Sequence, residues 1–286
     1  MQVHEVDAFL AKREADVPHL RPDQHKRVIW ADKAGQRTPI SVVFVHGFSA
    51  SSGELQPLCE IIAQALGANL HYTRLAGHGQ DGAAMGQATW TDWMADTDEA
   101  LAVGRAIGER VVVVSCSTGG TLVTLALARQ ARDIAATVFV SPNYGMTSVI
   151  ARALLAAPFV RRWGPILLGA ERGFEAANPR HATYWTLRYP TKAVFAMDDA
   201  VRACRGVDVS TIKTPACFVF SEKDRVVDPS KTRAVAAAWG GPAEVMPQEA
   251  RRGDDENAHV LAGDALSPLS TEPIAEAVLR WLEPHV

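Results

Sequence analysis

Runs of apolar residues alternate with amphipathic segments along most of this chain. The clearest run is Val111–Val114, four consecutive valines, which is typical of a strand buried on both faces of a parallel sheet. Thr38–His46 has the same apolar character, whereas Gly53–Leu66 carries apolar residues at helical spacing and is followed by Gly67, a residue suited to a helix end. This alternation predicts an α/β fold, with a mostly parallel sheet and helices on both of its faces.

Other segments extend the pattern in both directions. Thr89 and Asp92 have the spacing of a capping box, which predicts a helix from there to Ile107. A last helix, with an apolar stripe, is expected to open at Ser270–Pro273, and a short helix is expected over 3–13. The further strands that we expect are 69–75, 136–140 and 216–221.

The segment 142–209 breaks this alternation. It contains apolar, helix-like stretches but no clear sheet strand, and about 65 residues are far more than a plain crossover between two strands needs. We therefore expect a mostly helical cap at 142–209, inserted in a core formed by 27–141 and 210–286, after an N-terminal extension at 1–26. The alternative is that these are ordinary helices of the core.

Net charge, the distribution of apolar residues and the cysteines argue against nucleic-acid-binding, membrane-spanning and disulfide-rich proteins. The net charge of −3 gives no electrostatic footprint for nucleic acid or for an anionic membrane. The N-terminus does not read as a secretory signal, and no stretch has the roughly 18 apolar residues of a transmembrane helix. The cysteines are widely spaced and suggest neither a zinc site nor a disulfide framework, so we expect a cytoplasmic protein without a metal or cofactor. They are Cys59, Cys116, Cys204 and Cys217.

The turn after the valine run is the strongest candidate for chemistry. A strand, a tight turn centred on Ser117 and the helix-like segment Thr121–Arg129 form the context of a nucleophile elbow. The first glycine of the usual pattern is replaced by Ser115, whereas Gly119–Gly120 keep its second half. The simpler interpretation is a small-residue loop, and Cys116 is an alternative nucleophile that nothing in the sequence marks as a thiolate.

A serine nucleophile needs a base, which follows it in the chain order of this arrangement. Three histidines follow Ser117. His181 falls in the expected cap, and His285 lies next to the C-terminus. His259 lies on a polar loop shortly before the last helix, so it is the candidate base.

The acid that orients this base should follow a late strand. Asp224 comes shortly after the strand at 216–221 and is the preferred candidate. Asp228 is followed by Pro229, which is typical of a helix N-cap and so of a structural role. Glu222 stays open as a second candidate.

The oxyanion of an acyl-transfer reaction needs two donors. One is the backbone N–H of Thr118, directly after the nucleophile. The other should come from the loop after the first buried strand, where Gly47 allows a close approach and the N–H of Phe48 follows. His46 precedes the serine in the chain, so we interpret it as a residue that holds this loop.

These motifs together resemble the α/β-hydrolase superfamily over residues 27–286, and within it the branch of monoacylglycerol lipases and small bacterial carboxylesterases. That resemblance implies ester hydrolysis without a cofactor under a small helical cap. It assigns the catalytic triad to Ser117, Asp224 and His259 and the oxyanion donors to Phe48 and Thr118. Positions 115 and 221, usually glycine in the family, are serine here. The motifs are His46–Phe48, Leu75–Gly79, Trp90–Trp93, Ser115–Gly120, Ser221–Asp224 and His259–Leu261.

We therefore expect a serine carboxylesterase or monoacylglycerol-lipase-like enzyme whose partner is a small ester with an apolar acyl group. Cleavage of a thioester, amide or carbon–carbon bond at the same site is the alternative, as is a receptor that uses the pocket only for binding. Some of the apolar cap residues should line a pocket over Ser117; otherwise these residues only pack the cap onto the sheet or form a homodimer contact. They are Met146, Val149, Ile150, Leu154, Leu155, Phe159, Val160, Trp163, Ile166, Leu167 and Leu168.

Overall fold

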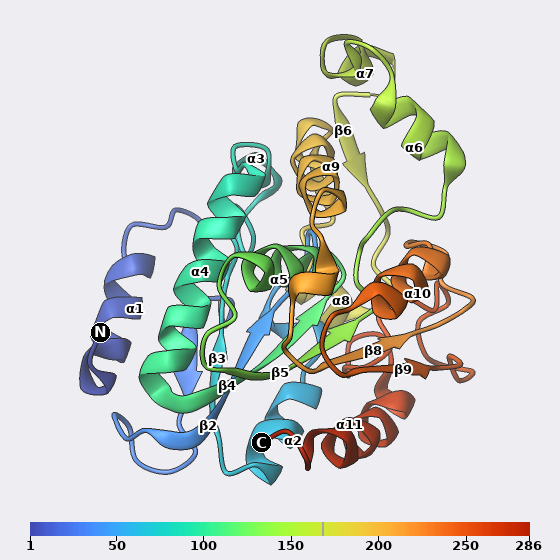
Figure 1. Cartoon of the computed structure of the whole chain (residues 1–286). Helices are drawn as coiled ribbons and strands as arrows, with labels where there is room; N and C mark the ends of the chain where they lie inside the picture. Colours follow the sequence, from blue (N-terminus) through green and yellow to red (C-terminus); the bar gives the residue numbers. More distant parts are fainter. Residues whose placement is uncertain (168) are drawn as a thin grey trace.

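A seven-stranded sheet forms the centre of the computed structural model, which describes residues 1–167 and 169–286 (Figure 1). The spatial order is β1-β3-β2-β4-β5-β8-β9, with β1 antiparallel to β3 and the other neighbours parallel. The predicted α/β architecture is thus confirmed. The strands are β1 (Arg27–Ile29), β2 (Thr38–Val45), β3 (Asn69–Tyr72), β4 (Gly108–Cys116), β5 (Ile134–Val140), β8 (Ala216–Phe220) and β9 (Ala243–Pro247).

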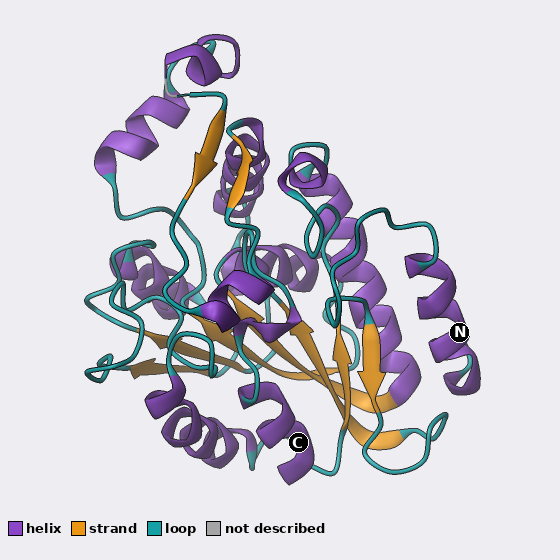
Figure 2. Cartoon of the chain, turned by 180° about the vertical axis from the view of Figure 1, so that it is seen from behind, coloured by secondary structure: helices purple, strands orange, loops and turns teal. Residues whose placement is uncertain are grey.

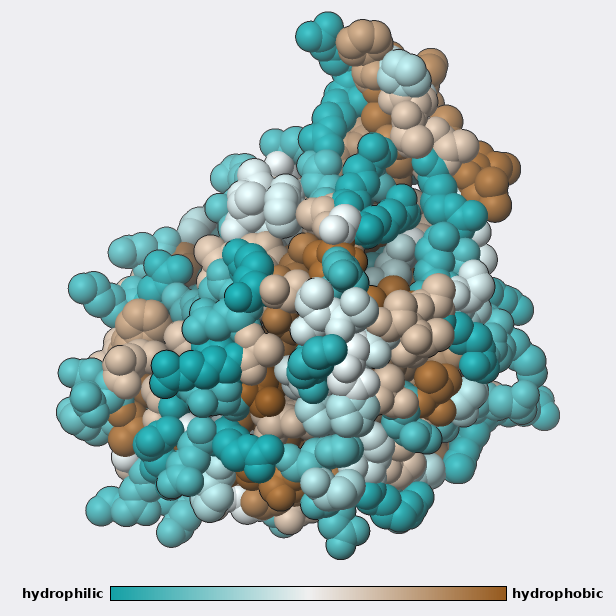
Figure 3. Space-filling model, in the orientation of Figure 1, coloured by the Kyte–Doolittle hydropathy of each residue, from teal (hydrophilic) through white to brown (hydrophobic). Residues whose placement is uncertain are grey.

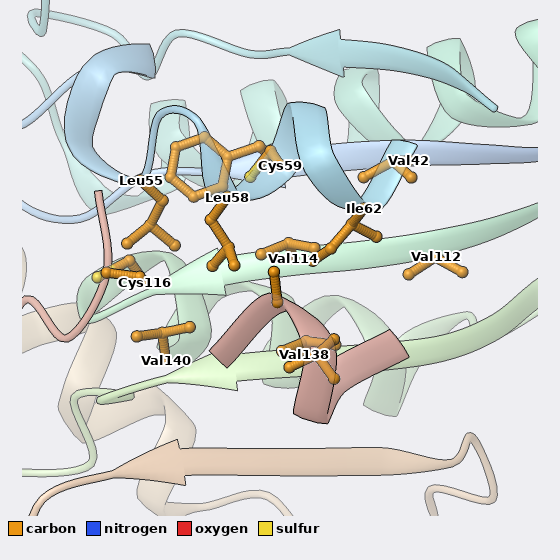
Figure 4. Close-up of a cluster of buried hydrophobic side chains, with 14 of the residues drawn as sticks. Val42, Leu55, Leu58, Cys59, Ile62, Val112, Val114, Cys116, Val138 and Val140 are labelled. Carbon is orange, nitrogen blue, oxygen red and sulfur yellow. The ribbon is translucent and has the colours of Figure 1, made fainter. Parts of the chain in front are cut away.

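The valine run supplies both faces of the sheet. Val112 and Val114 pack into the cluster that contains Leu58 of α2, and Val111 and Val113 pack into the cluster on the opposite face. Figure 4 shows the first of these clusters, where the even-numbered strand residues face α2. Because successive side chains of a strand point to opposite faces, a continuous apolar run is what a sheet covered on both sides requires.

Helices cover the two faces unequally. α2 and α11 lie on one face, whereas α4, α5, α9 and α10 lie on the other (Figure 1). The 3₁₀ turns are η1 (Val3–Glu5), η2 (Ser52–Glu54) and η3 (Val209–Thr211). The α-helices are α1 (Val6–Glu14), α2 (Leu58–Ala65), α3 (Gly82–Met85), α4 (Trp90–Ile107), α5 (Thr118–Arg129), α6 (Val149–Ala156), α7 (Val160–Leu167), α8 (Pro179–Tyr184), α9 (Lys192–Arg205), α10 (Pro229–Ala238) and α11 (Pro268–Leu282).

The N-terminal segment is fastened to the sheet layer by packing and by buried ion pairs. α1 contributes to a small apolar cluster with the end of α4. Glu14 at the end of α1 accepts from Arg74 at 2.8 Å. Lys26 Nζ lies 2.7 Å from Asp96 Oδ1 and 2.5 Å from a carboxylate oxygen of Glu99, with its side chain only 3% exposed. The whole extension is therefore tied to α4 and to the loop after β3.

Between β5 and β8 the chain leaves the sheet layer. β6 (Glu171–Gly173) and β7 (Arg188–Pro190) pair antiparallel, a small sheet that the sequence pattern did not predict. α9 packs on α5, so this part of the segment covers the main sheet. α6 and α7 project away from the body (Figure 2).

Apolar side chains gather at the outer end of this projection (Figure 3). Each of five cap residues is between 66% and 82% exposed, so these five do not line a pocket over Ser117. Leu155 and Val160 are buried against Phe195 of α9. Leu168 lies outside the described residues. The five are Val149, Ile150, Phe159, Ile166 and Leu167.

Most predicted elements are present, and their differences have local causes. The capping box of Thr89 and Asp92 opens α4 as predicted. The last helix begins earlier than expected, at Pro268, so that Pro273 lies inside it. β1 and β9 were missed because edge strands are short and carry polar residues, which blunts the hydrophobic pattern. Among the described residues, no helix is long and apolar enough to span a membrane.

Candidate active site

Ser117 occupies a sharp, strained turn between β4 and α5. Its φ is +50° and its ψ is −117°, a conformation that residues with a Cβ rarely adopt. Its N–H donates to Val140 O at 3.0 Å, and its carbonyl accepts from Asn143 N at 2.9 Å. These bonds hold the turn at the carboxyl edge of the sheet, as the nucleophile-elbow pattern predicts.

Small residues next to Ser117 allow the chain to form this turn close to β2. A Cβ on Gly119 would lie 2.1 Å from Val45 O, so only glycine allows α5 to start this close to β2. Ser115, in place of the usual glycine, is buried, and its Oγ donates to Val138 O at 3.4 Å. The added hydroxyl group is therefore accommodated in the turn.

The structure brings Ser117, His259 and Asp224 into one chain of hydrogen bonds. Ser117 Oγ lies 3.0 Å from His259 Nε2, and His259 Nδ1 lies 2.8 Å from Asp224 Oδ2. Asp224 Oδ1 accepts from the backbone N–H groups of Val226 and Val227 at 2.7 and 2.9 Å. With Nδ1–H directed at the carboxylate, His259 Nε2 is free to accept the serine proton.

The environment of His259 favours its protonated form. Burial by itself lowers the pKa of the imidazole, but the charge and the hydrogen bond of Asp224, together with Asp255 and Glu54, outweigh burial and raise this pKa above its ordinary value. Asp255 also shapes the loop, since its Oδ2 accepts from the N–H groups of His259 and Val260 at 3.0 and 2.9 Å. Asp255 was not predicted as a site residue, although an aspartate in a polar loop four residues before the histidine is a signal for such a turn.

The loop after β2 lies against the elbow. A Cβ on Gly47 would lie 3.1 Å from Ser117 Cβ, which places this loop beside the candidate nucleophile. His46 holds the loop, as predicted: its Nδ1 donates to Gly47 O at 2.9 Å and its Nε2 accepts from Leu75 N at 3.1 Å. Phe48 follows, with its ring packed edge-on against the ring of Tyr189 from β7.

The N–H of Thr118, which the sequence also suggests as an oxyanion donor, lies in the first turn of α5. N–H groups in the first turn of a helix have no acceptor within that helix, and the helix dipole favours negative charge there. The first turn of α5 and the loop that carries Phe48 therefore both lie next to Ser117.

Other candidates from the sequence lie elsewhere. Asp228 caps α10 by accepting from Ser230 N at 3.1 Å, the structural role predicted for it. Glu222 is half exposed and pairs with Arg233. The thiol of Cys116 is fully buried, and burial raises its pKa well above the ordinary value, so it is not a thiolate.

Glu54 is a further buried carboxyl group at this site, and no local sequence pattern predicts it. Its Oε2 accepts from Gly47 N at 2.7 Å, and its residue is only 2% exposed. Burial raises the pKa of Glu54 to about 7, against the opposing effects of Gly47 N–H and His259. Within the described part of the chain, no group of three His, Cys, Asp or Glu side chains could hold a metal ion.

The sequence of this chain matches a known protein family and a characterised relative. A family model described as serine aminopeptidase, S33, matches residues 37–245. The thermostable monoacylglycerol lipase of Bacillus sp. (strain H-257) is 27% identical over 191 residues, which cover 67% of this chain and 73% of that protein. The predicted superfamily and branch are consistent with both matches.

Solved structures share the fold. A chain from the work on the metagenome-derived lipolytic enzymes LipS and LipT superposes with a TM-score of 0.73 at 22% identity, covering 93% of this chain and 100% of that chain. The monoacylglycerol lipase of Paleococcus ferrophilus gives a TM-score of 0.64 at 17% identity, covering 92% and 99%. Est1E of Butyrivibrio proteoclasticus, bound to ferulic acid, gives 0.62 at 17% identity, covering 91% and 94%. The α/β-hydrolase fold is thereby confirmed.

Proposed function

This chain belongs to the hydrolase family described as serine aminopeptidase, S33, and from that premise we propose that it hydrolyses carboxylic esters through an acyl-enzyme on Ser117. The observation that carries the proposal is the hydrogen-bond chain from Ser117 Oγ through His259 to Asp224 on a strained elbow. The monoacylglycerol lipase relative and the lipolytic structural neighbours support the choice of ester substrates.

The reaction proceeds in two halves. Ser117 Oγ attacks the carbonyl carbon while its proton passes to His259 Nε2, and Asp224 stabilises the imidazolium. The N–H groups of Phe48 and Thr118 stabilise the oxyanion. His259 then protonates the leaving alcohol as the ester bond breaks. Water, deprotonated by His259, cleaves the acyl-enzyme by the same steps and releases the carboxylic acid.

We assign the segment 142–209 the role of a cap over this site, inserted in a core of 27–141 and 210–286 that follows the extension at 1–26. The packing of Tyr189 against Phe48, with ring centroids 5.0 Å apart, supports this role because it seats β7 on the candidate oxyanion loop. An apolar acyl group suits these aromatic rings. The substrate we propose is therefore a small ester with an apolar acyl chain, such as a monoacylglycerol.

The bond that is cleaved is the point at which alternatives remain. The family description names an aminopeptidase, and the same triad can cleave an amide or a thioester. Turnover should therefore be compared on ester, thioester and amide analogues of one acyl group, with ester hydrolysis fastest. A faster amide would replace the proposal with peptidase activity, and binding without turnover would replace it with a receptor.

Fluorophosphonate labelling tests the nucleophile directly. Mass spectrometry of the digested protein should find the adduct on Ser117 and nowhere else. An adduct on Cys116 or on another serine would refute the assignment.

We also propose a cytoplasmic location. It is supported by the four cysteines, which are all buried and free.

A homodimer through the exposed apolar residues of the cap is a further proposal, because it would cover apolar surface that is costly to leave in water. Size-exclusion chromatography with light scattering tests the dimer, and a monomer at high concentration would reject it.

A further inference from the structure

Glu54 places a second carboxyl group beside the candidate triad. It ends η2, between the loop after β2 and helix α2. A Cβ on Gly47 would lie 2.6 Å from Glu54 Oε1 and 3.1 Å from Ser117 Cβ, so the carboxyl oxygen and Ser117 Cβ are less than about 6 Å apart. A buried carboxyl at this distance acts on the charges that form when Ser117 reacts, because little water screens it.

Polar groups from four other elements face this carboxyl. Gly47 N–H donates to its Oε2 from the loop after β2. The thiols of Cys116 at the end of β4 and of Cys59 on α2 lie near it. The charged group that acts on it is the imidazole of His259, which also faces Asp224 and Asp255. None of these partners compensates the carboxylate as an arginine or lysine would.

We propose that Glu54 is a positioning residue of the active centre, which fixes the Phe48 loop through Gly47 and whose negative charge stabilises protonated His259. This inference rests on the proposed role of His259 as the base for Ser117. Asp224 would still orient the imidazole through Nδ1. Glu54 takes no proton from the substrate, and its contribution is the position of the loop and the electric field at the imidazole.

The titration of the two groups supports this coupling. Burial raises the pKa of Glu54 to about 7, and the pKa of His259 is also raised, in part by Glu54. When two ionisable groups interact in this way, each pKa value that a titration reports belongs to the pair and not to one residue alone. The pH at which His259 becomes a free base is therefore set by Glu54 as well as by Asp224.

The test compares Glu54→Gln with the wild type by NMR titration of the His259 ring. Glutamine keeps an oxygen for Gly47 N–H and removes the charge. The pKa of His259 should fall by about half a unit or more, and the acidic limb of kcat/KM for an ester should move to lower pH by a similar amount. Glu60→Gln is the matched control, since Glu60 lies on α2 and is not among the groups that shift the pKa of His259. This control should change neither the pKa of His259 nor the acidic limb of kcat/KM.

The outcomes separate the two proposals. If Glu54→Gln lowers kcat but leaves the pKa of His259 and the acidic limb where they were, Glu54 is only structural and the inference is overturned. If Glu54→Gln does not fold, Glu54→Asp keeps the charge on a shorter side chain and should hold the pKa of His259 close to wild type; a large fall would overturn the inference. If wild type turns over no ester, the proposed function fails, but the NMR titration still measures the effect of Glu54 on His259.

Discussion

At the scale of single residues, Ser117 combines a reactive hydroxyl group with a backbone conformation that serine rarely adopts. Ser117→Ala and Ser117→Gly should both lose ester turnover by several orders of magnitude, because the nucleophile is gone. Glycine reaches positive φ without a Cβ clash, so Ser117→Gly should unfold with a free energy about 1 kcal/mol higher than Ser117→Ala. Urea titration of both variants measures the difference. Equal stabilities would mean that the elbow stores no strain.

The two aspartates after β8 should respond differently to the same substitution. Asp224→Asn should lower kcat by orders of magnitude, because His259 loses the carboxylate that orients its ring and stabilises its protonated form. Asp228→Asn should stay within a few-fold of wild type, since asparagine also caps helices well. Steady-state kinetics on one ester, with thermal unfolding as a check on folding, decides the matter. The reverse ranking would show that the acid is misassigned.

The buried carboxyl group of Glu54 should make the free energy of unfolding depend on pH. Its pKa is raised by burial to about 7, so between pH 4.5 and 7 the folded state keeps a proton that the unfolded state has lost. The free energy of unfolding should therefore fall as pH rises through this window, by up to about 3 kcal/mol from this residue. In Glu54→Gln this part of the slope should vanish. Urea unfolding of both proteins at pH 5, 6, 7 and 8 would reveal it, and parallel curves would contradict the prediction.

At the scale of elements, the segment that we propose as a cap has one part packed on the loop of Phe48 and another part exposed to water. β7 brings Tyr189 onto Phe48, whereas the tip of α7 exposes Ile166 at 82%. Each buried acyl methylene contributes about 0.8 kcal/mol, so kcat/KM on p-nitrophenyl esters should rise by up to about four-fold per added CH₂ until the pocket is full. A profile that peaks at acetyl would reject the lipase-like hypothesis, but it would not contradict the proposed triad of Ser117, Asp224 and His259.

Two variants locate the pocket. Tyr189→Ala should flatten the chain-length profile because it removes an aromatic ring beside the candidate oxyanion loop. Ile166→Ser, at the exposed tip, should leave the profile unchanged. If both variants have the same effect, the acyl pocket does not lie under β7.

Sequence patterns predicted the elements that are buried and repetitive, and missed those defined by contacts between distant segments. The valine run of β4 and the capping box of α4 could be read locally. The edge strand β9 and the β6–β7 pair could not, because their residues are largely exposed. Chain order and elimination brought out Ser117, Asp224 and His259. Nothing local marks Glu54, since its burial depends on how η2 folds back onto Gly47.

At the scale of the whole molecule, the extension is held by the buried pair of Lys26 and Asp96. Lys26→Met should destabilise the protein by about 3–5 kcal/mol, because Asp96 keeps a buried charge without its cation. Lys223→Met is the control, since its pair with Glu249 is largely exposed and should change stability by about 0.5 kcal/mol or less. Chemical denaturation of the wild type and the two variants measures both effects. If Lys26→Met loses no more stability than Lys223→Met, the pair of Lys26 and Asp96 contributes little to stability.

Valine residues fill both faces of β4, and this determines which sequence changes the strand should tolerate. Within Val111–Val114 either cluster receives an equivalent side chain, so exchanges among β-branched residues should be tolerated. One residue inserted in the run should leave both clusters apolar, but it should shift the register of β4 against β2 and β5 on one side of the insertion. The length of this stretch should therefore matter more for the position of Ser117 than the choice among β-branched residues within it, because the bonds of Ser117 to Val140 and Asn143 depend on the register of β4.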